Sequence, residues 1–296
     1  MNDQQLLDEQ NASFWAQLCG TNLAQQLGVN DSSRESLKIF DDWFFKFYGY
    51  LPKYVPFSRV DKKKTLEIGL GYGSVSQKLM ESGAEYHALD ISPAPVAFSK
   101  HRASLVGVDT IGQKASALEI PYPDNFFDLV VSIGCLHHTG DLPLALRETV
   151  RVLKPGGHLS VMVYSSLSYR QLYDSPSSWI KEKLGLVKQV SENADSKARA
   201  VYDANSEGDA APYVAFTSAK QLKSFVPGLE NVRICSENLN VGPPFSDFLL
   251  KNVKQYTTKK FRHNDELFLL RTRDLLLPLV RFFGLGTDYY LTGLKR

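Results

Sequence analysis

One stretch decides the fold: Thr65-Leu66-Glu67-Ile68-Gly69-Leu70-Gly71-Tyr72-Gly73, followed in the chain by His87-Ala88-Leu89-Asp90-Ile91-Ser92. Its apolar first half predicts a buried strand, and its three alternate glycines predict a tight turn where the backbone approaches a ligand closely. Asp90 ends a second predicted strand, where a carboxylate can accept hydrogen bonds from ribose hydroxyls. The order of strand, glycine turn, helix, strand and acid predicts a nucleotide site.

The glycine spacing distinguishes between kinds of nucleotide site. A dinucleotide fingerprint G-x-G-x-x-G that starts at Gly69 requires glycine at position 74, and the chain has Ser74 there. This departure counts against an NAD-dependent oxidoreductase. A turn that binds no ligand is the plain alternative, and the Asp90 partner counts against it.

Strands and helices alternate after the glycine turn. The hydrophobic pattern predicts strands at 65–70, 86–90, 127–133, 159–164, 232–235 and 288–294. Helices are predicted from Ser74 to Gly83, from near Pro93, from the N-cap Asp141 to the Lys154-Pro155-Gly156-Gly157 run, and from a capped start within Phe216-Thr217-Ser218-Ala219-Lys220-Gln221-Leu222. This alternation predicts an α/β fold with a parallel sheet.

Three further motifs follow in order: Ile120-Pro121-Tyr122-Pro123-Asp124-Asn125-Phe126-Phe127-Asp128-Leu129-Val130-Val131-Ser132, then Leu136-His137-His138, then Val152-Leu153-Lys154-Pro155-Gly156-Gly157. Together with the glycine run, residues 64–164 resemble the methyltransferase type 11 group of the class I S-adenosylmethionine (SAM) dependent methyltransferases. The resemblance implies a Rossmann-like seven-stranded mixed sheet whose last strand is antiparallel, with helices on both faces and C-terminal helical insertions. An amphipathic pattern before the glycine run, in Phe40, Phe44, Phe47 and Leu51, predicts an N-terminal helix that is either a helical lid over the cofactor or a helix packed against the core sheet.

The resemblance also implies SAM as the cofactor and assigns residues to it. Small residues let the backbone approach the methionine part of SAM, and Glu67 fixes the glycine loop or reaches the amino group of SAM through water. Asp90 accepts hydrogen bonds from the ribose, and the adenine lies between Ile91 and the Ser116 segment. Many relatives have an acid where Ser116 stands, so its side-chain role is open. The implied cofactor-binding residues are Glu67, Gly69, Gly71, Gly73, Asp90, Ile91, Ser116, Ala117 and Gly134.

Methyl transfer is an in-line displacement at a sulfonium carbon, so proximity and exclusion of water supply most of the catalysis. His138 and His137 are the candidate catalytic residues, because they follow a strand at the ligand-binding edge of a parallel sheet. A structural role for both in the turn is the alternative. No metal is expected, since Cys19, Cys135 and Cys235 are scattered without a C-x-x-C.

Composition narrows the partners. The 296 residues carry a formal net charge of +2, with 43% hydrophobic and 22% charged residues, which is ordinary for a globular protein and gives no support for nucleic acid. The polar N-terminus does not resemble a secretory signal, and the cysteine usage fits a reducing cytoplasm. Together with the resemblance, this composition leads us to expect a cytoplasmic enzyme that acts on a small, amphipathic metabolite with an oxygen, nitrogen or carbon nucleophile.

Six segments are predicted: a lid at 1–63, the SAM-binding core at 64–164, an acceptor cap at 165–215, a core helix and strand at 216–239, a basic amphipathic insertion at 240–284, and the last strand at 285–296. The 250–282 stretch combines basic and apolar residues, which fits either a membrane surface or an ordinary helix that packs on the core. A SAM-binding sensor or partner subunit without transferase activity, and an RNA methyltransferase, remain rival functions.

Overall fold

The structure is a computed structural model that describes residues 2–17, 21–174, 176–184, 194, 199, 202–205, 208–239 and 275–296. The chain divides into two compact units. The first comprises Met1–Tyr164, Lys188–Ile234 and Tyr290–Arg296, and the second comprises Ser165–Val187 and Cys235–Tyr289. The six predicted segments stay a prediction.

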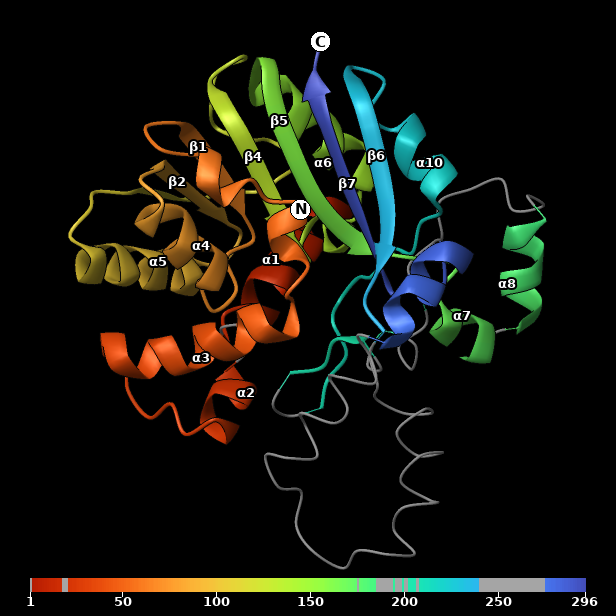
Figure 1. The fold of residues 1–296 in the computed structure, drawn as a ribbon, viewed down its shortest axis with the longest axis horizontal. Coiled ribbons are helices and arrows are strands. Elements are labelled where there is room, and N and C mark those ends of the chain that lie inside the picture. The colour runs from red at the N-terminus through yellow and green to blue at the C-terminus, as the bar shows by residue number, and fades with distance from the viewer. Residues whose placement is uncertain are drawn as a thin grey trace, which may run out of the picture. The chain divides into compact units, whose positions relative to one another are not determined.

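A seven-stranded sheet with the order β3-β2-β1-β4-β5-β7-β6 forms the centre of the fold (Figure 1). Strands β1 to β5 pair in parallel and β7 is antiparallel, so the predicted mixed sheet is confirmed. The strands are β1 Lys64–Ile68, β2 Glu85–Asp90, β3 Ile111–Lys114, β4 Phe127–Ile133, β5 Leu153–Tyr164, β6 Leu229–Glu237 and β7 Asp288–Lys295.

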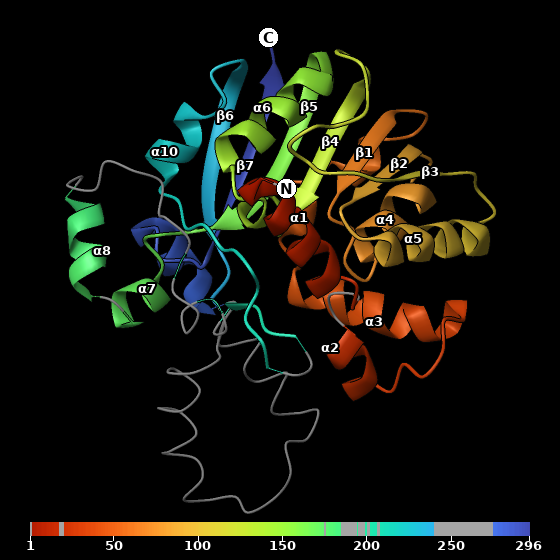
Figure 2. The same cartoon turned by 180° about the vertical axis from the view of Figure 1, so that it is seen from behind.

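Helices cover both faces of this sheet. Figure 1 shows α4 (Ser74–Glu81) and α5 (Pro93–Val106) in front of β1 and β2, and Figure 2 shows α6 (Leu142–Val152) and α10 (Ala219–Ser224) on the opposite face. This placement corresponds to right-handed crossovers in the β1-α4-β2, β2-α5-β3 and β4-α6-β5 units, the hand that the twist of strands favours. The other helical elements are α1 Asp3–Phe14, α2 Thr21–Gln26, α3 Arg34–Phe47, η1 Leu51–Lys53, η2 Phe57–Arg59, η3 Leu136–His138, α7 Tyr169–Asp174 and α8 Pro176–Lys183.

Local sequence explains where these elements start and which side they bury. The Asp141 side chain accepts from Leu144 N at 2.9 Å, and Ser218 forms a capping box with Gln221, so both predicted helix starts are confirmed. Leu66 and Val130, on the central strands, are 0% exposed. Two central strands buried on both faces hold the loops at their carboxyl ends in fixed positions.

One sequence-based boundary was wrong, and one strand was missed. The Lys154-Pro155-Gly156-Gly157 run was expected to end a helix, but β5 begins at Leu153 and includes these residues. The strand starts this early because Leu153 already pairs with Phe127 of β4, ahead of a register shift between Phe127 and Leu129. The predicted pattern also missed β3, an edge strand of four residues in which Ile111 is 53% exposed. A short strand with so little burial has no periodic hydrophobic signal.

The basic insertion falls mostly outside the described residues. The structure describes 275–296 but not 240–274, and residues 275–283 are helical. The membrane-surface interpretation of 250–282 therefore stays a prediction. Among the described residues, we find no helix with the length and apolar character that crossing a membrane requires.

Candidate active site

The glycine loop connects β1 to α4 at the carboxyl edge of the sheet. Gly69, Gly71 and Gly73 have φ angles of 77°, 52° and 81°, the left-handed region that glycine enters at no steric cost. Gly69 N donates to Leu89 O at 2.9 Å, which ties the start of the loop to the end of β2. The loop is thus held against the strand that carries Asp90.

Neighbouring side chains also require glycine in this loop. A Cβ atom at Gly69 would clash with the side chain of Cys135, whose Sγ would be 2.6 Å away, and a Cβ atom at Gly73 would lie 2.7 Å from Arg102 Cδ. Both distances are shorter than packed carbon atoms allow. The loop therefore lies directly against the turn that follows β4 and against α5.

Asp90 is buried, with 7% of its surface exposed, at the end of β2. Its Oδ2 accepts from Leu70 N at 2.9 Å and its Oδ1 accepts from Ser92 N at 2.9 Å. Burial raises the pKa of this carboxyl above its ordinary value, and the backbone hydrogen bonds oppose that rise. A carboxylate has lone pairs beyond these two bonds, so Asp90 can still accept from ligand hydroxyls.

The other predicted cofactor residues reach the same edge. Ala115 N donates to Asp90 O at 3.0 Å, which places the segment of Ser116 and Ala117 beside Asp90. Ser116 Oγ accepts from Leu118 N at 3.4 Å. Gly134, with a φ of 78°, follows β4 and is next to the Cys135 that contacts the glycine loop. Ile91 is partly exposed.

Glu67 lies inside β1 and is buried, with 3% of its surface exposed. Its Oε2 accepts from Ser76 Oγ and from Tyr86 OH, each at 2.6 Å, so it joins β1 to α4 and β2. Burial raises the pKa of Glu67 to about 7, against the effect of these hydrogen bonds and of Arg102. This geometry favours the first of its two predicted roles, in which it fixes the glycine loop through α4.

The N-terminal segment contacts the glycine loop through α3. Asp41 Oδ2 accepts from Arg102 Nη1 at 2.8 Å, and Asp41 Oδ1 accepts from Ser74 Oγ at 2.6 Å. The Tyr72 ring of the loop packs on Phe40 of α3, with ring centroids 4.4 Å apart. Helix α3 is therefore attached to the loop by both polar and aromatic contacts.

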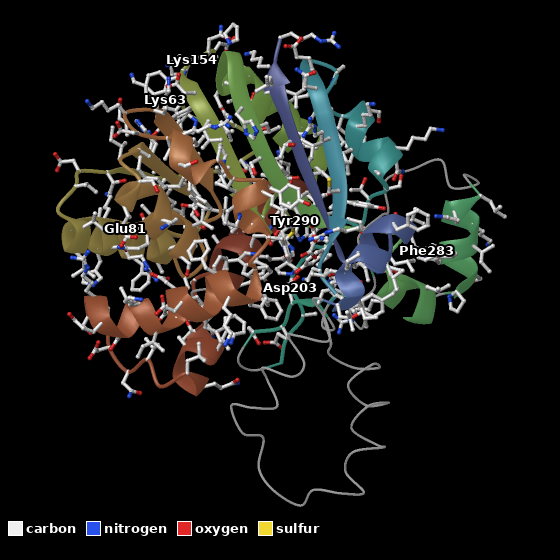
Figure 3. All side chains as sticks on the ribbon, viewed as in Figure 1. Lys63, Glu81, Lys154, Asp203, Phe283 and Tyr290 are labelled. Carbon is white, nitrogen blue, oxygen red and sulfur yellow. The ribbon has the colours of Figure 1, made fainter. Side chains whose placement is uncertain are left out.

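The histidine pair lies on η3, directly after the Cys135 turn. His138 Nδ1 is 2.7 Å from Tyr213 O, and because a carbonyl only accepts, Nδ1 carries the proton and Nε2 has the lone pair in the neutral ring. His138 Nε2 lies 3.6 Å from Asp203 Oδ2. In Figure 3 the labelled Asp203 lies toward the carboxyl edge of the sheet, and Lys154, at the start of β5, lies at the other edge.

His137 is fully buried, and neither of its ring nitrogens has a hydrogen-bond partner within the described part of the chain. Burial and the neighbouring His138 hold the pKa of His137 well below its usual range, so the ring is neutral. One nitrogen of His137, one of His138 and a carboxylate oxygen of Asp203 lie within 4.8 Å of one another. An orphaned buried ring nitrogen beside two more acceptors indicates a place where a ligand donates.

Helix α1 covers the histidine turn. Asn11 Nδ2 donates to His138 O at 2.9 Å and Gln4 Nε2 donates to Thr139 O at 2.8 Å. The Trp15 ring at the end of α1 lies 4.9 Å from the His138 ring, between centroids. The N-terminal segment thus contacts both the cofactor loop, through α3, and the candidate catalytic turn, through α1.

Three features define a class I SAM-dependent methyltransferase: the seven-stranded sheet with its antiparallel β7, the glycine loop, and the Asp90 carboxylate that accepts from the backbone of this loop at Leu70 N. Residues 66–161 match the methyltransferase domain model, so this part of the chain is a class I SAM-dependent methyltransferase domain. SAM is the cofactor of the family.

Curated relatives support this assignment. The ubiquinone/menaquinone biosynthesis C-methyltransferase UbiE of Vibrio cholerae is 35% identical over 142 residues, which are 45% of this chain and 54% of that protein. A phthiotriol/phenolphthiotriol dimycocerosates methyltransferase of Mycobacterium leprae is 34% identical over 100 residues, 33% of this chain and 36% of that protein. The matched part therefore spans about half or less of these relatives.

A solved structure extends the likeness in fold to most of the chain. In a complex of the Haloferax volcanii Trm112 methyltransferase activator with a methyltransferase, one chain is similar to this protein with a TM-score of 0.50 and 15% identity. The likeness covers 89% of this chain and 95% of that one. At this identity the comparison supports the fold and not the activity.

Sequence reasoning missed three residues of the site. Asp41 and Arg102 are charged residues within helices, and Asp203 lies in a loop between segments of low hydrophobicity. Asp41 pairs with Arg102, 61 residues later in the chain, and Asp203 lies beside His138, 65 residues earlier. Local sequence patterns contain no sign of contacts over such separations. The one available signal was an aspartate on the mainly aromatic stripe of α3.

Proposed function

We propose that this protein transfers the methyl group of SAM to an oxygen, nitrogen or carbon nucleophile of a small acceptor. The observation that carries the proposal is the buried Asp90 carboxylate at the carboxyl end of β2, whose position is fixed by Leu70 N and Ser92 N beside β1, where the strand order of the sheet reverses. When bound, SAM supplies the sulfonium methyl carbon that the acceptor attacks.

The residues at this edge fit a nucleoside ligand. Ser92 Oγ is fully buried beside Asp90 and has no hydrogen-bond partner among the described residues. A carboxylate with spare lone pairs next to an unused hydroxyl is a donor and acceptor set that suits two ribose hydroxyls. Ile91 and Ala117 offer apolar surface for the adenine ring. In this assignment Gly69, Gly71, Gly73 and Gly134 line the methionine part.

His138 is the residue that we assign as proton acceptor. Its Nδ1 proton is held by Tyr213 O, so its Nε2 lone pair faces away from the backbone and toward Asp203. An imidazole with a fixed tautomer is a suitable general base near neutral pH. His137 is neutral and fully buried, and in the proposal it orients the acceptor and does not exchange a proton with solvent.

A small molecule is the acceptor class that the chain supports. The curated relatives are named for a quinone pathway and for dimycocerosates, and a net charge of +2 does not demand a basic face for RNA. The long segments outside the core, 165–215 and 240–284, are where selectivity for the acceptor would arise.

The test combines SAM binding with methyl transfer. The purified protein is titrated with SAM by calorimetry, then incubated with methyl-labelled SAM and a metabolite extract of the cells that make it. We expect Asp90→Ala to weaken SAM binding at least tenfold and to abolish labelling. Asp109→Ala, at an exposed aspartate before β3, serves as the matched control.

The outcomes separate the rivals. SAM binding with no labelled product from any extract would favour a sensor or partner subunit. Labelling that disappears after ribonuclease treatment of the extract would favour an RNA methyltransferase. Unchanged SAM affinity in Asp90→Ala would refute the ribose assignment.

A further inference from the structure

We infer that the acceptor of the proposed methyl transfer is a primary amine, whose ammonium group binds between His137, His138 and Asp203. The inference rests on the proposed function and names the substrate class of the same site. Its basis is the set of hydrogen-bond acceptors that the fold brings together at the histidine turn.

The three acceptor groups lie within reach of one nitrogen atom. One atom from each of His137, His138 and Asp203 lies within 4.8 Å of the others, and His138 Nε2 is 3.6 Å from Asp203 Oδ2. Acceptors this close together can all lie within about 2.9 Å of a single donor atom, which is an ordinary hydrogen-bond distance. A primary ammonium has three N–H donors, one for each acceptor.

A hydroxyl acceptor fits this set less well. A hydroxyl has one hydrogen and can donate to only one of the three groups, so at least one of the two histidine acceptors, the buried His137 nitrogen or the His138 lone pair, stays without a donor. An unsatisfied buried polar atom costs about 1–3 kcal/mol. The number of acceptors therefore favours a group that donates several hydrogens.

Charge and aromatic surroundings favour a cation. Asp203 brings a negative charge to the cluster, 3.6 Å from His138 Nε2. The rings of Trp15 and Tyr164 lie against the histidines, at 4.9 Å from His138 and 4.1 Å from His137 between centroids, and the Tyr202 ring is 4.9 Å from that of Tyr164. Aromatic faces and a carboxylate together attract an ammonium group.

A metal ion is the other cation that such a set can bind, and the histidines count against it. Histidines that bind metals almost always donate their other ring N–H to a carbonyl or carboxylate. His138 does so to Tyr213 O, but both nitrogens of His137 lack a hydrogen-bond partner among the described residues. An ammonium needs only one lone pair from His137 and no such support.

The chemical step balances with the residues present. The N–H bond that points to His138 Nε2 breaks, and its proton forms an imidazolium that Asp203 stabilises. The nitrogen lone pair, turned by rotation about its C–N bond, forms a bond to the methyl carbon of SAM while the sulfonium C–S bond breaks. The products are a methylated ammonium and S-adenosylhomocysteine, and His138 releases its proton to solvent.

The test uses the wild-type protein and one metabolite extract divided in two. One half is treated with an amine-selective acetylating ester and the other is mock-treated, and both are incubated with deuteromethyl SAM. We expect labelling to fall at least tenfold in the acetylated half, and fragmentation of the products to place the label on nitrogen. Equal labelling in both halves would overturn the amine inference and leave the transferase proposal standing. No labelling in either half, with normal SAM binding, would overturn both.

A variant pair then tests the carboxylate. Asp203→Asn should raise KM for the amine at least tenfold while leaving the Kd of SAM within twofold. The control Asp209→Asn, at an exposed aspartate of the same loop, should match wild type. Unchanged KM in Asp203→Asn would count against the inference, as would a stoichiometric metal ion whose chelation abolishes labelling.

Discussion

Arg102 and Asp41 form a buried two-pronged ion pair between α5 and α3. Arg102 Nη1 donates to Asp41 Oδ2 at 2.8 Å and Nη2 donates to Oδ1 at 3.1 Å, and the Arg102 side chain is 0% exposed. The same carboxylate accepts from Ser74, the first residue of α4. One aspartate in the N-terminal segment therefore fixes the helix that follows the glycine loop.

Asp41→Ala should destabilise the protein and weaken SAM binding. Removing one partner leaves the Arg102 charge buried without compensation, which costs about 3–5 kcal/mol of free energy of unfolding, measurable by urea denaturation. The Kd of SAM should rise because Ser74 loses its acceptor. Asp42→Ala is the control: its pair with Lys38 is about two-thirds exposed on both sides, and a change below about 1 kcal/mol is expected. Equal stabilities of the two variants would refute the role of Asp41.

Features made by residues that are close together in the chain could be predicted from the sequence, and contacts between residues that are far apart could not. Strand β1, the glycine loop, β2 and Asp90 are contiguous in the chain, so hydrophobic patterns and glycine spacing were enough to predict them. The pairing of Asp41 with Arg102 and of Asp203 with His138 depends on tertiary packing. The sequence pattern around a charged residue on a helix is the same whether its side chain faces solvent or a buried partner. Ser74 illustrates this. In the sequence it only marked the absence of a glycine that a dinucleotide fingerprint requires, whereas in the structure its hydroxyl donates to Asp41.

Gly69→Ala should abolish SAM binding because of contact and not only because of backbone conformation. An alanine there adopts a φ of 77° and places its Cβ against Cys135. The control is Gly107→Ala, where φ is 79° but no atom lies within 4 Å of the added Cβ. The free energy of unfolding of Gly107→Ala should fall by only about 1 kcal/mol, the cost of the left-handed conformation, and its SAM affinity should match wild type. Calorimetric titration with SAM separates the two, and similar losses of affinity would contradict the contact argument.

Glu67 should make stability depend on pH around neutrality. Its folded pKa of about 7 is above its ordinary value of 4.5, so its contribution is fully present below pH 4.5 and is lost as the pH rises through 7. Glu67→Gln does not titrate. Between pH 4.5 and pH 8 the free energy of unfolding of wild type should therefore fall by about 3 kcal/mol relative to Glu67→Gln. Urea denaturation across this range measures the difference, and parallel curves would show that the carboxyl is ionised throughout.

Asn11→Ala should loosen the histidine turn, although Asn11 lies 127 residues before His138 in the chain. The Asn11 side chain is buried and donates to His138 O at 2.9 Å, so its removal leaves that carbonyl without this donor at a cost of about 1–3 kcal/mol. Because Trp15 follows on the same helix end and packs on His138, a looser α1 should also raise KM for the acceptor. The Kd of SAM should stay unchanged, since the described contacts of α3 hold the glycine loop independently. Gln10→Ala, at the exposed neighbouring position, is the matched control. If Asn11→Ala lowers stability but leaves KM unchanged, α1 supports the fold alone and does not shape the acceptor site.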